Sequence, residues 1–463
     1  MTADRLLETS EEVERVAPRR FEPYPEYRAS GVEWLGEVPA HWAVAPVYSR
    51  YEVALGKMLD AKRISGHRLA PYLRNVDVQW DRVNCEGLPE MDFEQTERQR
   101  YALRLGDALV CEGGEVGRTA LWRGELSECY YQKAVHRVRP RRETERVRFF
   151  FYTMYALAQS GVFAAGGEAS TISHLTAVRL RHYRFVFPSA EEQQVIANVL
   201  DRETAEIDAL VAQKERLIEL LREKRAALIT RTVTKGLDPG VAMKDSGVEW
   251  LGEIPAHWEV LRTKFVARLE SGHTPSRSHP EYWEDCTVPW FALADVWQIR
   301  EGLVEYVHET AEKISELGLA NSAARLLPKG TVMLSRTASV GFSAIMGTAM
   351  ATTQDFVNWV CGPRMVPEFL LYVFRSMKPE FKHLTMGSTH QTIYMPDVGR
   401  FVTPVPPVEE QQRIVGLIRR ETAKLDALAN KIRLGIERLR EFRTALISAA
   451  VTGKIDVREA ACD

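Results

Sequence analysis

Hydrophobic positions recur at a seven-residue spacing in two stretches of the chain, residues 191–238 and 409–456. In the second stretch these positions, together with the position between them, are Ile418, Leu425, Leu428, Ile432, Leu439, Phe442 and Leu446. In the first stretch they are Leu200, Ile207, Leu210, Leu217, Leu221 and Leu228. Such a heptad pattern predicts two long helices whose apolar seams pair, with interruptions at Lys214, Lys224 and Gly435. The alternative is an amphipathic helix that packs on its own domain.

Both stretches carry signals for helix ends. They begin at PSAEEQQ and PPVEEQQ, where proline and acidic residues favour a helix start. Gly236 and Gly453 lie near the other ends, where helices commonly stop.

The regions between these stretches have a different pattern, typical of mixed helix and strand. Short β-rich runs stand between Gly, Asn and Asp turns: ALVCE (108–112), HRVRP (136–140), TVMLS (331–335) and FVNWV (356–360). One apolar helix is expected in each region, at 149–160 and 368–377. Because strands and helices do not alternate at a regular spacing, a Rossmann core is not supported.

The chain repeats itself. SGVEWLGEVPAHW at 30–42 recurs as SGVEWLGEIPAHW at 246–258, with 12 of 13 positions identical. The two heptad stretches align without a gap at an offset of 218, with 24 identities in 48 positions. The near-constant offset indicates a duplication of about 217 residues rather than a short-period solenoid. Each copy holds a divergent region of about 150 residues followed by a well-kept helical segment, which suggests two specificities on one frame.

Composition places the chain among ordinary globular proteins. It has 463 residues, 45% hydrophobic and 27% charged, with a net charge of −2. The six cysteines are scattered without a CxxC, which excludes a zinc ribbon and disfavours a disulfide framework. The charged N-terminus lacks the apolar core of a signal peptide, and 149–167 is interrupted by Gly and Gln, so we expect a cytoplasmic protein without a membrane span.

The common catalytic motifs are missing from the sequence. CEGGEVGRTA lacks the Walker spacing, since Glu112 stands where glycine is needed and Arg118 where lysine is needed. TPVPPVEE lacks the Asn or Asp and the aromatic residue of an amino-methylation motif, and there is no HExxH. His41 and His257 share one repeat position beside Trp42 and Trp258, which favours a role in packing. We therefore expect no catalytic residues and no metal site in this chain.

The divergent regions carry side chains suited to contact with DNA. Residues 43–190 hold 22 Lys and Arg against 17 Asp and Glu, whereas 259–408 hold 14 against 15. Polar loops recur at matching places in both copies and offer the donors and acceptors that read base edges. The candidates are Lys62, Arg63, His67, Arg74, Asn75, Gln79, Arg118, Gln132, Lys133, Ser173, His174, Thr274, Ser276, Arg277, Arg336, Gln354, Ser388, Thr389, His390, Gln391 and Tyr394. A solvated surface loop is the alternative for each loop taken alone, and the modest charge calls for a partner in binding.

These residues resemble the specificity subunit of type I restriction-modification systems. The resemblance rests on GVEWLGEVPAHW and its copy, PYLRNVDVQW, SGHTPSRSHPEYW, VPWFALADV, GSTHQTIYMPDVGRF and LISAAVTGKID, and it covers about Ser30 to Asp456. It implies an α/β (α+β) fold: two globular target recognition domains joined by two long antiparallel coiled-coil helices, with a pseudo-twofold internal repeat. The loop at 387–392 resembles a family loop close to DNA, firmly at His390 and Gln391 and only loosely at Ser173 and His174 of the first copy.

The resemblance also implies the division of labour. The expected segments are an N-terminal extension (1–29), a first recognition domain (30–190), a first helix and linker (191–238), a second recognition domain (239–408) and a second helix with the tail (409–463). The partners would be double-stranded DNA, two modification (methyltransferase) subunits and, in some complexes, restriction (translocase and nuclease) subunits. S-adenosylmethionine, ATP and Mg would belong to those partners, and this chain would hold no cofactor and act as the non-catalytic subunit.

Two other classes of function stay open from the residues alone. One is a stand-alone DNA methyltransferase or nuclease with unfamiliar motifs, which a methyl-transfer or cleavage assay on the purified chain would detect. The other is a coiled-coil adaptor that binds only protein, which a gel shift with mixed-sequence duplex would separate.

Overall fold

The structure is a computed structural model that describes residues 21–59, 66–165, 174–386 and 391–459. The chain folds into two compact units, the first formed by the residues up to Gln213 together with those from Leu434 onward, and the second by Lys214–Arg433. Each unit therefore takes one part of each long helix, so the division falls inside the helices rather than at 191, 239 and 409.

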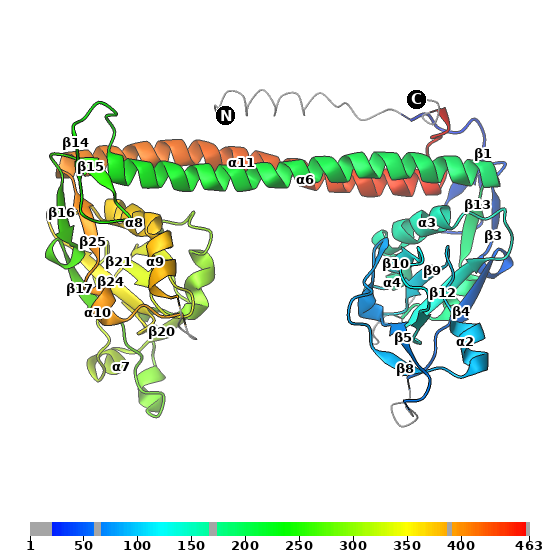
Figure 1. The fold of residues 1–463 in the computed structure, drawn as a ribbon, viewed down its shortest axis with the longest axis horizontal. Coiled ribbons are helices and arrows are strands. Elements are labelled where there is room, and N and C mark those ends of the chain that lie inside the picture. Colours follow the sequence, from blue (N-terminus) through cyan, green and yellow to red (C-terminus); the bar gives the residue numbers. More distant parts are fainter. Residues whose placement is uncertain (1–20, 60–65, 166–173, 387–390, 460–463) are drawn as a thin grey trace. The chain divides into compact units, whose positions relative to one another are not determined.

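The first unit gathers short strands into small sheets (Figure 1). Its strands are β1 (Tyr27–Ala29), β2 (Glu37–Pro39), β3 (Ala43–Pro46), β4 (Tyr51–Leu55), β5 (Leu69–Leu73), β6 (Val78–Gln79), β7 (Arg82–Val83), β8 (Glu90–Asp92), β9 (Ala108–Cys111), β10 (Thr119–Leu121), β11 (Tyr130–Tyr131), β12 (Val135–Pro140) and β13 (Arg184–Phe187). The main sheet has the antiparallel order β10-β9-β12-β4. A second sheet has the order β11-β5-β8, and β13 pairs with β3, β1 with β2 and β6 with β7.

The second unit repeats this plan. Its strands are β14 (Met243–Asp245), β15 (Glu253–Pro255), β16 (Glu259–Arg262), β17 (Ala267–Ser271), β18 (Val288–Phe291), β19 (Tyr306–Val307), β20 (Glu312–Ile314), β21 (Val332–Ser335), β22 (Ser343–Met346), β23 (Ala351–Thr352), β24 (Phe356–Cys361) and β25 (Val402–Val405). The order β17-β24-β21-β22 matches β4-β12-β9-β10, with β19 added at the edge, and β20-β18-β23 matches β8-β5-β11. The four strand runs expected from the sequence are confirmed as β9, β12, β21 and β24.

Short helices complete each unit. In the first they are α2 (Gln95–Tyr101), α3 (Val147–Gln159), α4 (Val162–Ala165) and α5 (Ala177–His182), with 3-10 turns η1 (Val47–Ser49) and η3 (Asn75–Asp77). In the second they are α7 (Glu316–Ala320), α8 (Pro367–Ser376), α9 (Lys378–Leu384) and α10 (Met395–Val398), with 3-10 turns η4 (Thr263–Phe265), η5 (Pro280–Trp283) and η6 (Leu293–Gln298). The two expected apolar helices are confirmed as α3 and α8, which bury nearly every side chain because they pack between the sheets and the long helices.

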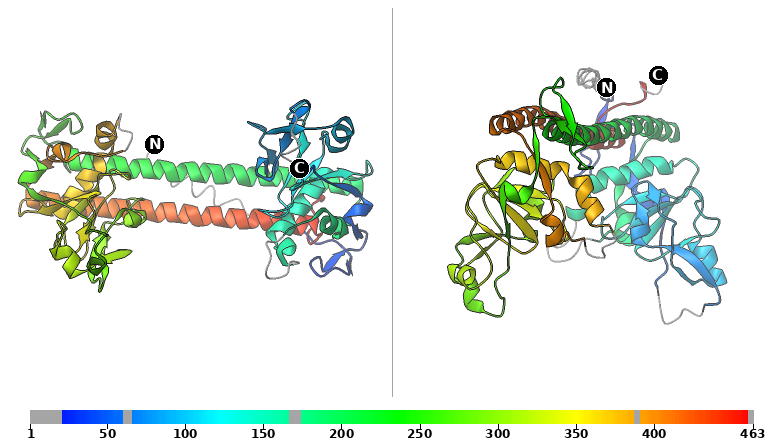
Figure 2. Two further views of the ribbon diagram at one scale, coloured as in Figure 1. Left: turned by 90° about the horizontal axis from the view of Figure 1, so that it is seen from below. Right: turned by 60° about the vertical axis from the view of Figure 1, so that its left-hand side comes forward.

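Two long helices, α6 (Ala190–Lys235) and α11 (Val408–Val451), lie side by side in both units, as Figures 1 and 2 show. In the first unit Arg443 pairs with Asp208 at 3.0 Å, and in the second Arg225 pairs with Asp426 at 3.4 Å. From the first pair to the second, the residue number rises on α6, from 208 to 225, and falls on α11, from 443 to 426. The two helices therefore run antiparallel. The structure therefore has the helix pairing that the heptad pattern predicts, rather than two helices that pack only on their own domains.

The buried positions of the seam differ in one detail from the sequence pattern. Of the residues expected in the seam, the buried ones are Leu200, Ile207, Leu221, Ile418, Ile432 and Leu446. Further buried residues lie four positions after a seven-residue repeat position, at Thr204, Ile218, Thr422, Ala429 and Ile436. The residues three positions after, Leu210, Leu217, Leu428 and Phe442, are only half-buried. Thr204 lies 3.3 Å from the Tyr152 hydroxyl, so burial at this position includes contact with the recognition domain.

The matched Val-Gly pairs at 116–117 and 340–341 form turns between strands, as expected. Gly117 and Gly341 have φ values of +83° and +90°, which side chains with a Cβ rarely adopt. A Cβ on Gly117 would lie 2.6 Å from the ring of Phe163, so the turn also packs closely. Among the described residues, no helix is both long and apolar enough to cross a membrane.

Candidate nucleic-acid interface

A repeated polar contact holds each recognition domain to the start of its long helix. Trp42 donates its indole N–H to Glu192 at 3.0 Å, and His41 Nε2 lies 3.1 Å from the same carboxylate. In the second unit Trp258 and His257 contact Glu410 at 3.2 and 2.9 Å. The histidines at the repeated PAHW turns therefore hold the frame, as their expected packing role requires.

In both units a close backbone approach sets the base of the candidate loops. A Cβ on Gly56, after β4, would lie 2.2 Å from the carbonyl oxygen of Gln132. A Cβ on Gly272, after β17, would lie 1.9 Å from that of Thr353. Only glycine fits at such an approach, so both loops leave the sheet at the same point. The two divergent regions thus present different side chains from one backbone frame.

In the first unit three candidates meet around the turn at Gly113 and Gly114. Asn75 donates its amide N–H to the carbonyl of Gly113 at 2.8 Å, and Arg118 Nη2 donates to the carbonyl of Asn75 at 2.9 Å. A Cβ on Gly113 would lie 3.0 Å from His174 Nδ1, so the imidazole lies against this turn. The Asn75 Oδ1 and Arg118 Nε atoms are buried without a hydrogen-bond partner in the described part of the chain. The cluster therefore combines a fixed backbone with unused polar atoms.

Charge partners hold neighbouring side chains of this cluster. Arg74 binds Asp77 through Nε and Nη2 at 2.9 and 2.8 Å, and these hydrogen bonds raise the pKa of Arg74. Burial raises the pKa of the Cys111 thiol to about 11, so the thiol stays protonated at neutral pH. Arg74 is thus directed toward its own carboxylate.

In the second unit a different set of candidates meets at the corresponding place. Thr274 donates its hydroxyl to Gln354 Oε1 at 2.6 Å, and Arg336 Nε donates to the carbonyl of Gln354 at 3.0 Å. The carbonyl of Gln391 accepts from the amide of Ala338 at 2.9 Å. These contacts bring Thr274, Arg336, Gln354 and Gln391 together from four separate segments.

One backbone contact relates the two clusters. The amide of Leu175 donates to the carbonyl of Glu112 at 2.8 Å, and the amide of Ile393 donates to that of Arg336 at 2.8 Å. Each bond holds the segment before α5 or α10 against the end of a central strand. His174 therefore occupies the position that Thr392 occupies in the second unit, so the loops are equivalent in place and different in chemistry.

Arg277 stacks on an aromatic side chain, Trp283. Its guanidinium lies 3.7 Å from the centre of the Trp283 ring and donates to Glu312 at 2.9 Å. The side chain is nonetheless 62% exposed, so it is positioned by stacking while remaining open to solvent. Ser276 bonds to Ser278 in the same exposed loop.

The remaining candidates are spread out or lie outside the described residues. Gln79 donates to the carbonyl of its neighbour Val76, and His67, Lys133 and Tyr394 are exposed on separate segments. Gln132 is half-buried beside Gly56. The candidates outside the described residues are Lys62, Arg63, Ser173, Ser388, Thr389 and His390.

Sequence reasoning missed the partners that fix these groups. The sequence did not predict that Arg277 stacks on Trp283. Nor did it predict that Glu192 and Glu410 bind the histidines of the PAHW turns. The identity of EEQQ in both copies was a usable signal for the two glutamates. Across the described residues, no group of three or more His, Cys, Asp and Glu side chains is placed to hold a metal ion.

Comparison with known proteins identifies the domain that each unit carries. The family model described as type I restriction modification DNA specificity domain matches residues 60–220 and 255–438. These two matches together cover most of the chain, and each falls mainly within one unit. The chain therefore belongs to the type I restriction-modification DNA specificity family, whose domain it contains twice.

Relatives with curated names agree with this family. A protein of Methanocaldococcus jannaschii assigned as the MjaX type I restriction enzyme specificity subunit is 23% identical over 434 residues, which span 92% of this chain and 96% of the relative. The MjaIX specificity subunit of the same organism is 29% identical over 170 residues, 36% of this chain and 38% of the relative. The EcoR124I/EcoR124II specificity subunit of Escherichia coli is 25% identical over 259 residues, which span 54% of this chain and 56% of the relative.

Two solved structures share the fold. A chain from a study of complex assembly and conformational transition in the type I restriction-modification system has a TM-score of 0.64 at 18% identity, covering 90% of this chain and 99% of that one. The HsdS subunit from Thermoanaerobacter tengcongensis has a TM-score of 0.51 at 17% identity, covering 90% and 98%. The expected α+β fold with an internal repeat is thereby confirmed.

Proposed function

We propose that the chain is the subunit that gives a type I restriction-modification complex its DNA sequence specificity. Each recognition domain reads one half of a bipartite, asymmetric site in double-stranded DNA. The observation that carries this proposal is the pair of family matches, one per unit, on a shared frame with unlike loops. Because the residues at matching places differ, Glu112 against Arg336 and His174 against Thr392, the two half-sites differ in sequence.

The long helices act as the connection between the two readers. Antiparallel pairing places part of α6 and part of α11 in each unit, so a single helical pair belongs to both recognition domains. We propose that this pair sets the spacer between the half-sites and docks two methyltransferase subunits. Those subunits supply S-adenosylmethionine and the adenine chemistry, and restriction subunits supply ATP, Mg and cleavage in complexes that contain them.

Weak charge supports the need for such partners. The net charge of −2 gives little general attraction to DNA phosphates, which dominate the affinity of most DNA-binding proteins. We propose that the methyltransferase subunits supply most of the contacts with the DNA backbone, and that the complex acts in the cytoplasm. This chain supplies the sequence readout and no catalysis.

An exchange of one divergent region tests the proposal. Residues 43–190 are replaced by those of a relative, the variant is expressed with its modification subunits, and methylated adenines are mapped by sequencing. One half-site changes and the other stays the same, because each domain reads its own half. The matched exchange of residues 259–408 changes the opposite half. A change of both halves in either variant contradicts the proposal.

A further inference from the structure

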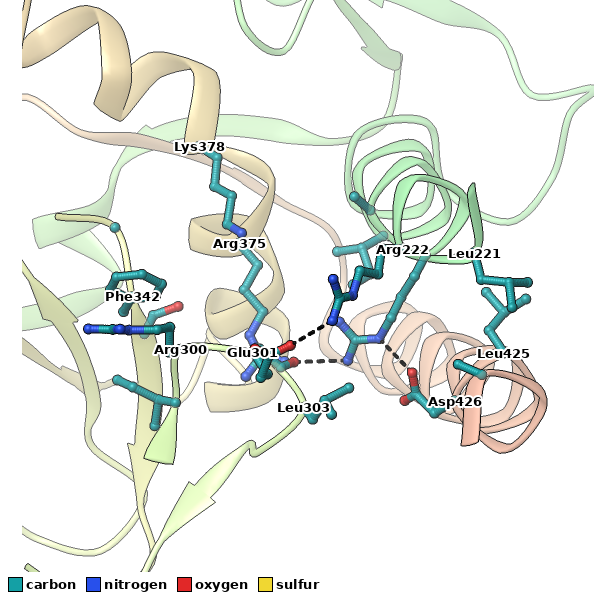
Figure 3. Close-up of a pocket in the computed structure, with 18 of the residues that line it drawn as sticks. Leu221, Arg222, Arg300, Glu301, Leu303, Phe342, Arg375, Lys378, Leu425 and Asp426 are labelled. Atoms are coloured by element: carbon teal, nitrogen blue, oxygen red, sulfur yellow. Dashed lines mark hydrogen bonds and ion pairs between the residues drawn. The ribbon is translucent and has the colours of Figure 1, made fainter. Parts of the chain in front are cut away.

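The second unit contains a cavity of about 290 Å³ with strongly positive walls (Figure 3). It is lined by α6, α11, the end of α8, the segment 299–303 and the turn at 341–343. Its charged residues are Arg222, Arg225, Arg300, Arg375, Lys378 and Arg433 against Glu301 and Asp426. Six cationic side chains and two carboxylates give the cavity a net positive charge, which favours binding of an anion.

Arg375 is a half-buried cation that places two buried, unused donor atoms in this cavity. Its Nη2 donates to the carbonyl of Val304 at 2.6 Å. Its Nε and Nη1 atoms are buried and have no hydrogen-bond partner among the residues that the structure describes. Burial and the nearby Arg225 lower the pKa of Arg375 to about 10, so the guanidinium remains charged at neutral pH. A buried charged group with free donors is costly unless a ligand satisfies it.

The first unit shows that the frame does not require this arginine. Helices α3 and α8 bury their residues in the same order, with Tyr152 matching Tyr372 and Tyr155 matching Arg375. In the first unit the guanidinium of Arg443 lies 5.2 Å from the Tyr155 ring centre and pairs with Asp208. In the second unit Arg225 pairs with Asp426 at the matching place, but Arg375 faces it instead of a ring. In the second copy, therefore, the Arg375 cation lies next to the Arg225 cation, where the first copy has a tyrosine ring.

The rim and walls complete a site for a small molecule. Arg300 and Lys378 are exposed and have no ion pair within the described ranges of the chain. Ile299, Leu303 and Phe342 form apolar wall next to these charges. Cationic donors beside an apolar wall suit a phosphate group that is joined to a hydrophobic or aromatic body.

We propose that this cavity binds a phosphate dianion carried by a small molecule, either free inorganic phosphate or a nucleoside phosphate. The phosphate accepts from the free donors of Arg375 at depth and from Arg300 and Lys378 at the rim. Duplex DNA is a poorer occupant because its backbone phosphates cannot leave the helix to reach a buried guanidinium. This ligand site goes beyond sequence reading and depends on no DNA contact.

Calorimetric titration of the full chain at about 0.15 M salt tests the proposal, with inorganic phosphate, AMP and adenosine as probes. A phosphate-bearing probe binds with saturation and adenosine does not. Equal affinity for phosphate and AMP identifies free phosphate as the source, whereas tighter AMP binding identifies a nucleoside phosphate. Arg375→Tyr, which restores the residue of the first copy, weakens binding by at least about tenfold.

Two further variants keep the test decisive. The surface pair Arg300→Ala and Lys378→Ala leaves the core intact and also weakens binding, and the control Tyr155→Phe in the first unit leaves it unchanged. The proposal is overturned if no phosphate-bearing probe binds with saturation below about 10 mM. It is equally overturned if Arg375→Tyr and the rim variant both bind as the original does, or if duplex DNA displaces the probe in an Arg375-dependent manner, which assigns the cavity to DNA.

Discussion

Single residues that are identical in both copies do the same structural work. Gln193 accepts from the amide of Arg146 at 2.9 Å and donates to the carbonyl of Pro188. Gln411 accepts from the amide of Val366 at 2.9 Å and donates to the carbonyl of Pro406. Each glutamine thus satisfies backbone groups where a recognition domain meets its long helix, which explains why EEQQ is kept in both copies.

One ion pair between a recognition domain and its long helix occurs at the same place in both units, but with the positive and negative residues exchanged. In the first unit Arg148 on α3 pairs with Asp201 on α6 at 2.6 Å. In the second unit Glu368 on α8 pairs with Arg419 on α11 at 3.1 Å, and Arg419 also binds Glu305 at 2.7 Å. An exchange of the two helices between the domains would bring like charges together, so the pattern favours the native pairing.

The Arg419 cluster predicts a dependence of stability on pH. Burial raises the pKa of Glu305, but hydrogen bonds from Arg419 and Tyr372 outweigh it, so this pKa lies below its ordinary value. A carboxylate with a lowered pKa stabilises the folded state above its unfolded pKa of about 4.3 and loses this effect as the pH falls through its folded pKa. Arg419→Met therefore destabilises the second unit by about 1 kcal/mol at pH 7, and the difference shrinks below about pH 4.

Denaturant unfolding of both proteins at pH 7, 5 and 3.5 measures this difference. The control Glu368→Gln removes the weaker pair and leaves the one to Glu305, so its effect is smaller. A destabilisation by Arg419→Met that is equal at pH 7 and 3.5 would show that lost packing, not charge, is responsible.

Which residues form the candidate interface was only partly predictable from the sequence. Asn75, Arg118 and His174 were picked as polar loop residues, but their meeting depends on the close packing at Gly113, which no local pattern encodes. Arg74 was picked on the same grounds and instead binds Asp77. A polar side chain that stays unpaired and one that binds a neighbouring carboxylate look alike in sequence, since tertiary contacts decide between them.

At the level of elements, the duplication made the long helices predictable and left the detail of their seam open. Leu200 and Ile207 stand out by their seven-residue spacing and are buried. The intervening buried position falls on Thr204, Thr422 and Ala429, which hydrophobicity alone does not mark. Leu210 and Leu428, which the seven-residue pattern also marks, are half-buried.

The shared helices predict a change in the spacer when both are lengthened. Seven helical residues are inserted after Gln213 in α6 and after Arg433 in α11, where the two units divide. Seven residues keep the seam in register and add about 10 Å to each helix. The spacer between methylated adenines grows by about three base pairs, at about 3.4 Å per base pair, while both half-sites stay the same.

Mapping of methylated adenines in the assembled complex measures this change. Insertion into α6 alone mismatches the two helices, so activity is expected to fall instead of the spacer shifting. An unchanged spacer with active, doubly lengthened protein would show that the helices do not set the distance.

At the scale of the whole chain, the described segments nearest its two ends, residues 21–39 and 453–457, contact each other inside the first unit. Tyr27 donates its hydroxyl to the carbonyl of Gly453 at 3.0 Å, and the amide of Asp456 donates to the carbonyl of Glu22 at 2.7 Å. Lys454 donates to the carbonyl of Glu37 at 2.7 Å, and Val457 is fully buried. The first strand pair thus begins at Tyr27, within the segment expected to be an N-terminal extension, and the tail is part of the same core.

The second unit makes the corresponding junction with a continuous backbone. There Lys235, at the end of α6, donates to the carbonyl of Glu253, which matches Glu37 in the repeat. The short segment 237–242 then leads directly into β14, which pairs with β15 as β1 pairs with β2. One junction is made by continuous backbone and the other by contacts between residues 21–39 and 453–457, so the two junctions are equivalent in place.

A circular permutation follows from this equivalence. Glu459 is joined to Phe21 by about five Gly and Ser residues, and new ends are opened within the exposed segment 238–241. The permuted chain keeps every strand and helix of the described residues, so its unfolding midpoint stays close to the original and the map of methylated adenines is unchanged. A control opened between Phe151 and Tyr152 in buried α3 does not fold, because it breaks a core helix. If the 238–241 permutant also fails to fold, the covalent junction of the second unit and the contact junction of the first are not equivalent, and the chain depends on where it begins.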